Sequence, residues 1–373
     1  MRSVFAMICS LLLGWLPGAF AQTAASSRTS SPHEKTWQFA VSGDSRNCGD
    51  VVMPSIARKV REDGAAFYWH LGDYRAIYDF DQDYRARNPN ASILQYETGA
   101  WPDFIQRQLG PFGDLPVYLG LGNHETMPPK TRSEAIAQFA DWLDTTELRT
   151  QRLRDNPSDH LVKFYYHWFR SGMDFITLDN ASDDQFDDAQ LTWLAAQLAR
   201  DAKNPEIRTV VVGMHEALPE SISAGHSMND SAQEAESGRK AYHELVLFRK
   251  QTQKNVYVLA SHSHFVMDNV YNTACHRIPP DEVLPGWIVG TAGAVRYRLP
   301  ADVSGSTQHK ADVYGYLLAT VSADGTIRFE FKQINESDVT ESTRKDYKDE
   351  FIHDCFAGNS ASYMPAGPVC PAK

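Results

Sequence analysis

The feature that most constrains this chain is a short apolar segment that ends in a glycine and a polar residue, repeated along the sequence. Apolar runs of this length, bounded by turn residues, are typical of buried strands. Three instances lie in the first third: Trp37 to Val41 before Gly43-Asp44, Ala65 to Leu71 before Gly72-Asp73, and Pro116 to Leu121 before Gly122-Asn123. Strands that alternate with helices favour an α/β fold.

The pattern continues to the last third of the chain. Arg208 to Val212 precedes Gly213-Met214-His215, and Val256 to Ala260 precedes Ser261-His262-Ser263-His264. Helices are expected near residues 51–61, 92–108, 187–200 and 242–250, and further strands near 164–169, 174–179, 287–289, 316–321 and 326–331. We predict an α/β fold of two packed mixed sheets flanked by helices, in four layers. The polar stretch 217–239 is expected to be a long surface loop.

The N-terminus has the pattern of an export signal. Arg2 precedes the apolar run Val4 to Leu16, and Ala19-Phe20-Ala21 forms a small-residue cleavage site. The alternative, a membrane anchor, needs about 20 apolar residues and this run is shorter. We therefore expect a signal peptide at 1–21, a flexible Ser/Thr-rich leader at 22–35, and a secreted or periplasmic protein without a membrane span.

The net charge disfavours two classes of partner. The formal charge is −11, and removal of residues 1–21 takes away Arg2 and no acidic residue, so −11 becomes −12. An acidic protein repels polyanions on average, so we expect neither nucleic acid nor an anionic membrane as a partner. The oligomeric state does not follow from the sequence.

Four cysteines remain beyond the signal segment: Cys48, Cys275, Cys355 and Cys370. An even number in an oxidising compartment favours two disulfides, and three pairings are possible. A Cys355–Cys370 bond would close a short loop and fix the C-terminal tail at 336–373. The remaining bond would then be Cys48–Cys275.

The polar residues that follow the strands are of metal-ligand type. Each one alone also fits a turn, a helix cap or a core histidine. The carboxyl ends of strands in an open sheet are, however, where binding sites assemble, and the residues are Asp44, Asp73, Asn123, His215, His262 and His264. Carboxylate, amide and imidazole donors together suit two ions such as Mn, Fe or Zn.

The five segments, in this order, resemble the motifs of the calcineurin-like metallophosphoesterases. The match covers about residues 36–265 and includes Gly122-Asn123-His124-Glu125. The resemblance implies a catalytic domain over 36–335 with a β-sandwich of two mixed sheets. It implies a first metal on Asp44, Asp73 and His264, and a second on Asp73, Asn123, His215 and His262, with His124 beside the phosphoryl group.

Arg46 departs from the family pattern. The first motif usually reads Asp-x-His, and its His is a further ligand of the first metal, but this chain has Asp44-Ser45-Arg46. In the purple acid phosphatase branch a Tyr supplies a ligand at the position of Ala76, with Tyr74 and Tyr78 out of register. Arg46 can bind a substrate phosphate through its planar guanidinium or replace the charge of the first metal.

The resemblance implies hydrolysis of a small phosphate ester by a metal-bound hydroxide, without a covalent intermediate on Ser or Cys. A phosphomonoesterase is the first expectation. A phosphodiesterase with the same residues is one alternative, and a non-catalytic phosphate- or ligand-binding protein with a degraded metal site is another.

Three smaller expectations concern residues near the motifs. Outer hydrogen-bond partners of the metal ligands are expected among Glu216, Asp268 and Asn269. The acidic run Asp79, Asp81 and Asp83 lacks the Gly and terminal Glu of a calcium loop, so a solvated loop is expected. Other histidines, including His167 and His226, fit no ligand spacing and are expected to be structural or exposed.

Overall fold

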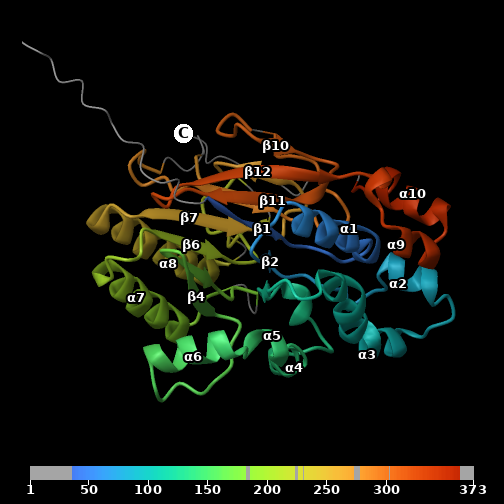
Figure 1. Ribbon diagram of the computed structural model, residues 1–373, viewed down its shortest axis with the longest axis horizontal. Coiled ribbons are helices and arrows are strands. Elements are labelled where there is room, and N and C mark those ends of the chain that lie inside the picture. Colours follow the sequence, from blue (N-terminus) through green and yellow to red (C-terminus); the bar gives the residue numbers. More distant parts are fainter. Residues whose placement is uncertain are drawn as a thin grey trace, which may run out of the picture. The chain divides into compact units, whose positions relative to one another are not determined.

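Two mixed β-sheets pack face to face in this computed structural model, and helices cover their outer faces (Figure 1). The structure describes residues 36–181, 185–222, 226–229, 231–272, 278–301 and 303–361. The predicted fold class is confirmed: the described chain forms an α/β sandwich of two mixed sheets flanked by helices. The predicted signal peptide and leader lie outside the described residues.

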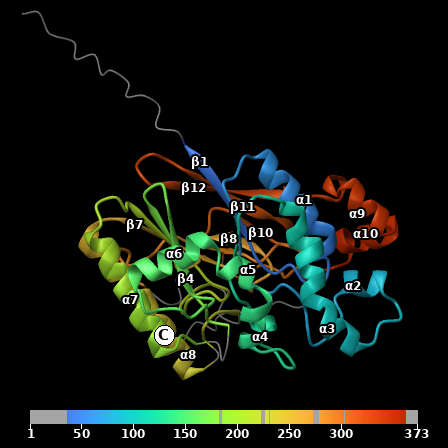
Figure 2. The ribbon, with the colours of Figure 1, turned by 60° about the horizontal axis from the view of Figure 1, so that its bottom comes forward.

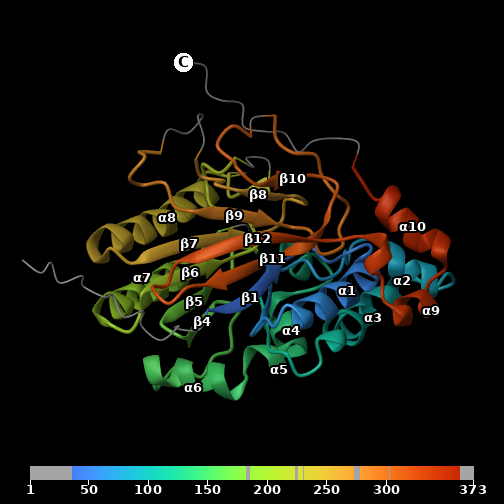
Figure 3. The ribbon, with the colours of Figure 1, turned by 45° about the horizontal axis from the view of Figure 1, so that its top comes forward.

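The first sheet has five strands in the order β12-β11-β1-β2-β3. Strands β1 (Trp37–Ser42), β2 (Tyr68–His70) and β3 (Val117–Leu119) run parallel, while β11 (Tyr314–Val321) pairs antiparallel with both β1 and β12 (Ile327–Ile334). Figure 3 shows β1, β11 and β12 side by side in this sheet.

The second sheet has seven strands in the order β10-β8-β9-β7-β6-β5-β4. Its parallel centre contains β5 (Met173–Thr177), β6 (Thr209–Gly213), β7 (Asn255–Ala260) and β9 (Gly286–Val289). Antiparallel strands β4 (Tyr166–Arg170), β8 (Val266–Asp268) and β10 (His309–Lys310) complete it. Strands β8 and β10 were not among the predicted elements.

The alternation of side chains along each strand creates the layers. Phe39 and Val41 of β1 point into the core between the two sheets, whereas Ala40 points to the opposite face, against α1 (Gly49–Glu62). On the far side, α7 (Asp188–Lys203) and α8 (Ala232–Thr252) cover the second sheet and contact each other. The order helix, sheet, sheet, helix is the four-layer arrangement expected for this fold.

Shorter helices fill the connections after β2 and β3. Figure 2 shows α4 and α5 between α3 and α6. Their bounds are α2 Gln82–Arg87, α3 Ile93–Phe104, α4 Arg132–Gln138, α5 Ala140–Leu143 and α6 Thr146–Asp155. A π-helical turn (Ile105–Leu109) and a 3₁₀ turn (Gly110–Phe112) continue α3, and a 3₁₀ turn (Asn123–Glu125) follows β3.

The prediction of a surface loop over 217–239 is wrong in its second half, because α8 begins at Ala232. Ser231 accepts a hydrogen bond from the backbone of Glu234, and the Glu234 side chain accepts one from the backbone of Ser231. This capping box starts a helix in a polar sequence. The buried side of the helix includes small residues such as Ala235 and Gly238, which give little hydrophobic signal.

The C-terminal segment packs against the start of α1. A 3₁₀ turn (Glu336–Asp338), α9 (Glu341–Asp346) and α10 (Asp349–Ala357) follow β12. Cys355 of α10 forms a disulfide with Cys48, directly before α1. The predicted pairs Cys355–Cys370 and Cys48–Cys275 are therefore both wrong, because the fold brings residues 307 positions apart together. Cys275 and Cys370 lie outside the described residues.

No helix in the described ranges is long and apolar enough to cross a membrane.

Candidate metal centre

The predicted ligands lie at the carboxyl ends of five strands, where the two sheets meet. Asp44 follows β1, Asp73 follows β2 and Asn123 follows β3, all in the first sheet. His215 follows β6, and the segment with His262 and His264 follows β7, in the second sheet. Parallel neighbours present their carboxyl ends at one edge, so residues up to 220 positions apart meet there.

Backbone hydrogen bonds hold the loops of the two sheets together. The N–H of Asp44 donates to the oxygen of Gly72 at 3.0 Å, and the N–H of Ser45 donates to the oxygen of Asp73 at 2.9 Å. Between the sheets, the N–H of Gly43 donates to the oxygen of Val289 at 3.0 Å. Backbone hydrogen bonds therefore connect these turns both within the first sheet and across to the second.

Two motif glycines allow the β2 and β3 loops to approach closely. Gly72 has φ +102°, a conformation that other residues rarely adopt, and a Cβ there would collide with the backbone nitrogen of Gly122. A Cβ on Gly122 would in turn collide with the backbone and carboxylate of Asp73. Both positions require glycine, which explains two of the three Gly residues that precede Asp or Asn in the motifs.

Three ligand-type residues have a left-handed backbone. The φ angles are +61° for Asp44, +60° for Asp73 and +62° for His262. Such conformations are uncommon for residues other than glycine, cost about 1–3 kcal/mol each and cluster at functional sites. The surrounding hydrogen bonds maintain a backbone that aims these side chains at a common point.

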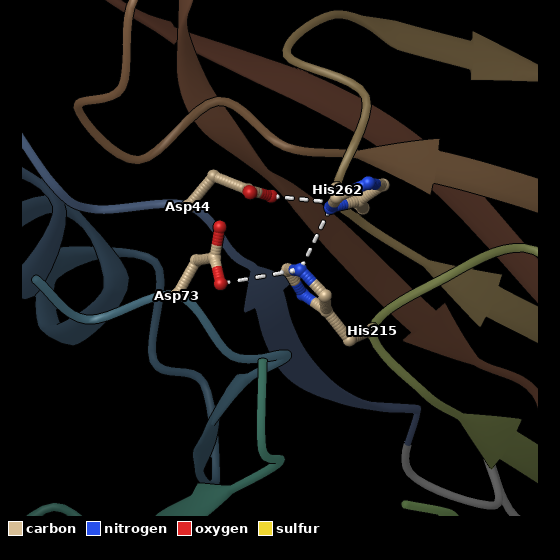
Figure 4. Close-up of side chains that lie close together, drawn as sticks. All are labelled: Asp44, Asp73, His215 and His262. Atoms are coloured by element: carbon tan, nitrogen blue, oxygen red, sulfur yellow. Dashed lines mark hydrogen bonds and ion pairs between the residues drawn. The ribbon is translucent and has the colours of Figure 1, made fainter. Parts of the chain in front are cut away.

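The carboxylates and imidazoles form a buried cluster (Figure 4). Asp44, Asp73, His215 and His262 each offer one ligand atom, and these atoms lie within 4.8 Å of one another. His215 Nε2 is 3.3 Å from Asp73 Oδ1 and 3.0 Å from His262 Nδ1. Oδ2 of Asp44 also accepts a hydrogen bond from the backbone N–H of His262 at 2.8 Å.

Asn123 faces the same cluster through its side-chain oxygen. Asn123 Oδ1 is 3.0 Å from His215 Nε2. His215 Nδ1 lies 3.0 Å from the backbone oxygen of Leu71, which only accepts, so the proton is on Nδ1 and the lone pair on Nε2. Lone-pair atoms of His215, Asn123 and Asp73 therefore face each other at short range, an arrangement that a cation stabilises.

The residues predicted for the first metal lie beside this cluster, together with Arg46. His264 Nε2 is 3.2 Å from Asp44 Oδ1. Arg46 Nη2 lies 3.1 Å from the same His264 nitrogen, Arg46 Nε lies 3.6 Å from Asp73 Oδ2, and Arg46 Nη1 contacts Nε2 of His124. The structure thus brings all eight predicted site residues together. The guanidinium of Arg46, however, lies among the three residues predicted to hold the first metal.

Burial and neighbouring charges shift the pKa values of Asp44 and Asp73 in opposite directions. Burial is the main cause that raises the pKa of Asp44 to about 7, with His215 opposing and Asp73 adding to the rise. Burial also disfavours the charged form of Asp73, but nearby positive charge, of which the Arg46 guanidinium is the permanent part, holds its pKa well below the usual range. Asp73 is therefore the charged carboxylate at the centre of the site.

Burial keeps three imidazoles of the site neutral. Burial lowers the pKa of His124 to about 4, although Asp73 acts in the opposite direction. Burial likewise lowers the pKa values of His262 and His264 well below the usual range. Neutral imidazole is the form that binds a metal ion.

Two solved structures are similar to this chain in fold. A dimetal phosphatase from Danio rerio aligns with a TM-score of 0.48 and 12% identity, over 80% of this chain and 98% of the other. PhoD aligns with a TM-score of 0.47 and 13% identity, over 87% of this chain and 77% of the other. No protein-family model and no curated protein matches the chain. Likenesses this distant do not establish the function of this chain. Its function has to be inferred from the residues of the site.

Sequence reasoning missed three residues around the ligands. His226, expected to be structural or exposed, places Nδ1 3.1 Å from His262 Nε2. The ring of Tyr297 stacks on His264 at 4.0 Å. The exposed ring of Tyr78 lies 5.1 Å from that of His124. None of the three lies in a motif, and no spacing in the sequence links them to the ligands.

Of the three residues expected to be hydrogen-bond partners of the ligands, Glu216 lies close to one, whereas Asp268 and Asn269 have other contacts. Glu216 Oε1 lies 3.8 Å from His262 Nε2, so it is close to a ligand. Asp268, in contrast, accepts hydrogen bonds from Ser306, Thr307 and Gln308, which fix the 306–308 segment. The side chain of Asn269 donates to Asp268.

Proposed function

We propose that this protein is a metal-dependent phosphoric ester hydrolase that acts on small phosphomonoesters. The observation that carries the proposal is the group of mutually facing lone pairs on Asp73, Asn123 and His215, at 3.0–3.3 Å from His215 Nε2. Such atoms repel unless a cation lies between them. A site of carboxylate, amide and imidazole donors at the ends of parallel strands suits Mn, Fe or Zn.

Buried oxygens without partners support a metal at this site. Among the described residues, no hydrogen bond reaches Asp44 Oδ1 or Asp73 Oδ2. A buried carboxylate oxygen is normally hydrogen-bonded. Asp73 Oδ2 has the Arg46 cation 3.6 Å away, whereas Asp44 Oδ1 faces the lone pair of His264 Nε2 at 3.2 Å and requires another source of positive charge. The donor set therefore fits metal binding, with Asp73 as the carboxylate whose two oxygens face different neighbours. A bound metal supplies Lewis-acid activation of the phosphoryl group and of the attacking water.

Arg46 and His124 are the candidate phosphate-binding groups. A guanidinium carries five N–H groups, and Arg46 directs three of its nitrogen atoms at Asp73, His124 and His264. Each Nη atom has a second N–H that can donate to a phosphoryl oxygen, with the geometry that suits phosphate. His124 is 4% exposed, at the edge of the cluster, where it can contact the phosphoryl or leaving oxygen.

Ser45, next to Asp44 in the chain, is unsuited to act as a nucleophile. Ser45 Oγ lies 3.0 Å from His70 Nε2. His70 Nδ1 accepts the backbone N–H of Gly72, so Nε2 carries the proton and donates to the serine. A nucleophilic serine needs a neighbouring base that accepts its proton. The His70 nitrogen that faces Ser45 already carries a proton and cannot accept another. Direct attack by water on phosphorus follows as the proposed route.

The test is hydrolysis of p-nitrophenyl phosphate by the purified protein, before and after removal of metal with a chelator. We expect turnover that disappears with the metal and returns with Mn²⁺ or Zn²⁺. Bis(p-nitrophenyl) phosphate is the comparison substrate, and faster hydrolysis of this diester would replace the monoesterase proposal by a diesterase. Absence of turnover on both esters with metal bound would favour a phosphate-binding protein.

A further inference from the structure

Arg46 lies inside the donor set that the resemblance assigns to the first metal. Its Nη2 is 3.1 Å from His264 Nε2, and its Nε is 3.6 Å from Asp73 Oδ2. The Arg46 side chain is only 11% exposed. A guanidinium stays protonated in proteins, so a permanent positive charge lies where the family has a metal ion.

Arg46 and a metal would compete for the same lone pair of His264. His264 Nδ1 lies 2.6 Å from the backbone oxygen of Val295, which only accepts, so Nδ1 is protonated and Nε2 has the lone pair. Arg46 Nη2 donates to this lone pair, and the ring of Tyr297 stacks on the imidazole and limits its rotation. A metal ion on His264 would have to displace the guanidinium.

His124 is engaged with Arg46 in the same way. Its Nδ1 donates to the backbone oxygen of Ala76 at 2.7 Å, so its Nε2 lone pair is free to accept from Arg46 Nη1. Two imidazole acceptors on separate loops therefore hold one guanidinium. Each Nη atom donates to a different imidazole, so the guanidinium is held in one orientation and does more than lie near the site.

The second donor set is different, because three of its members direct only lone pairs at one another. His215 Nε2 faces Asn123 Oδ1 at 3.0 Å and Asp73 Oδ1 at 3.3 Å, and the His215 proton is on the other ring nitrogen. His262 Nδ1 adds a further ring nitrogen at 3.0 Å from His215 Nε2. The lone pairs of His215, Asn123 and Asp73 need a cation between them, whereas in the first set Arg46 already donates to His264.

The balance of formal charge also favours a single ion. When both are deprotonated to bind a metal, the buried Asp44 and Asp73 contribute two negative charges, and the Arg46 side chain beside them, 11% exposed, contributes one positive charge. One divalent ion brings the centre to a net charge of one positive, while two ions would leave three positive charges on these groups. Uncompensated charge away from water is costly, so the second ion is disfavoured while Arg46 is present.

We propose that this chain binds one metal ion, on the Asp73, Asn123, His215 and His262 side of the site, and that Arg46 takes the place of the first metal. The proposal rests on the metal-dependent function proposed above and deepens it. Arg46 supplies the fixed charge next to His124 and His264, and the two-metal expectation from the sequence is replaced by a mononuclear centre with a guanidinium partner.

The test counts metal ions per chain, independently of turnover. The purified protein, the variants Arg46→His and Arg46→Lys, and the control Arg328→His on the exposed face of β12 are saturated with Mn²⁺, freed of excess ion and analysed for Mn per chain. We expect about one ion in the wild-type protein, in Arg46→Lys and in the control, and about two in Arg46→His, where imidazole replaces the cation with a ligand.

Electron paramagnetic resonance of the same samples gives a second readout. An isolated Mn²⁺ is expected in the wild-type protein, and an exchange-coupled pair in Arg46→His. Two ions per wild-type chain, or no gain in Arg46→His relative to wild type, would overturn the proposal. If Arg46→His does not fold, the wild-type stoichiometry and the Arg46→Lys value still decide it.

The outcomes separate this proposal from the proposed function. One ion per chain without hydrolysis of either p-nitrophenyl ester would leave the mononuclear site standing and reject the hydrolase. Two ions per chain with chelator-sensitive hydrolysis would leave the hydrolase standing and reject the role of Arg46. A protein that binds no Mn²⁺ would reject the mononuclear centre whatever its activity.

Discussion

The carboxylate of Glu125 accepts a hydrogen bond from the backbone N–H of Asp73 at 2.9 Å, across the gap between the β2 and β3 loops. The same carboxylate accepts the N–H groups of Tyr74 at 2.8 Å and Gly122 at 2.9 Å. Glu125 is fully buried, and its two oxygens bind both loops that carry metal-ligand residues. The last residue of the Gly-Asn-His-Glu motif thus positions the loops that carry the proposed ligands Asp73 and Asn123.

Glu125→Gln should weaken metal binding. A glutamine presents one NH₂ group where the glutamate presents an oxygen, so at least one N–H of the loops would face another donor. Loss of such a partner typically costs about 10- to 100-fold in metal affinity. Titration with Mn²⁺ measures the change, and Glu236→Gln on the exposed surface of α8 is the control. Equal affinity in the two variants would show that the loops hold their positions without Glu125.

Asn123→Ala and His124→Ala should differ although the residues are adjacent. Asn123 faces His215 in the donor cluster, so its loss should reduce metal content together with turnover. His124 contacts Arg46 instead, so its loss should leave the metal content unchanged and lower kcat by about 100-fold or more. Metal analysis and kcat on p-nitrophenyl phosphate test both. Unchanged function in both variants would favour the non-catalytic binding protein.

Much of the fold could be predicted because strand and motif signals are local. The strands before Asp44, Asp73, Asn123, His215 and His262 are short apolar runs that end in turn residues, and the structure places them as expected. Their convergence follows from parallel pairing, which is a general rule for α/β sheets. The eight candidate site residues therefore meet in space, although their chemical roles stay predictions.

Features that depend on how side chains pack in the folded chain could not be predicted. The acidic run Asp79, Asp81 and Asp83 was expected to be a solvated loop, yet Asp81 and Asp83 are fully buried because Arg75 compensates their charge. Nothing local in an acidic run shows that a buried arginine faces it. The partner of Cys48 was missed for the same reason, since it depends on where α10 packs.

Arg75→Met should strongly destabilise the protein. The buried Arg75 guanidinium bonds Asp50 at 2.6 Å, Asp83 at 2.9 Å and Asp103 at 2.5 Å, and it lies two residues from Asp73. Removing one partner of a buried ion pair typically costs about 3–5 kcal/mol, because a charge is left uncompensated. The free energy of unfolding in urea measures the loss.

Arg85→Met on the exposed face of α2 is the matched control, with an expected change of about 0.5 kcal/mol or less. A similar small change for Arg75→Met would mean that the aspartates are protonated and need no cation. Arg75→Lys should recover only part of the stability, because an ammonium cannot reproduce the planar set of donors.

Loss of the Cys48–Cys355 disulfide should lower stability without removing the metal ligands. The bond joins residues 307 positions apart, so it removes much of the freedom of the unfolded chain. Cys48→Ser or Cys355→Ser should cost about 2–4 kcal/mol in unfolding free energy, measured with oxidised wild-type protein as the reference. Peptide mapping without reduction should recover the 48–355 link, and a Cys355–Cys370 peptide would contradict the structure.

Stability should fall at alkaline pH because of His167, which lies on β4 away from the metal cluster. Burial alone would lower its pKa, but Asp174 at 2.9 Å and Asp155 at 2.5 Å accept from its two nitrogens and raise the pKa to about 9. The unfolded value is about 6.5, so the stabilisation is fully present below about pH 6.5 and lost as pH rises through about 9.

Of the charged groups near the His167 imidazole, Asp201 also lowers stability as pH rises, and Arg200 keeps a permanent charge. Asp201, beside Asp174, has its pKa raised to about 9, mainly by burial, so its titration also removes stability as pH rises. Arg200 lies 3.8 Å from Asp155 and keeps its charge throughout. The difference in unfolding free energy between wild type and His167→Gln should therefore shrink by about 2–3 kcal/mol from about pH 6 to about pH 10. A difference that stays constant over this range would mean that His167 is neutral in the folded protein.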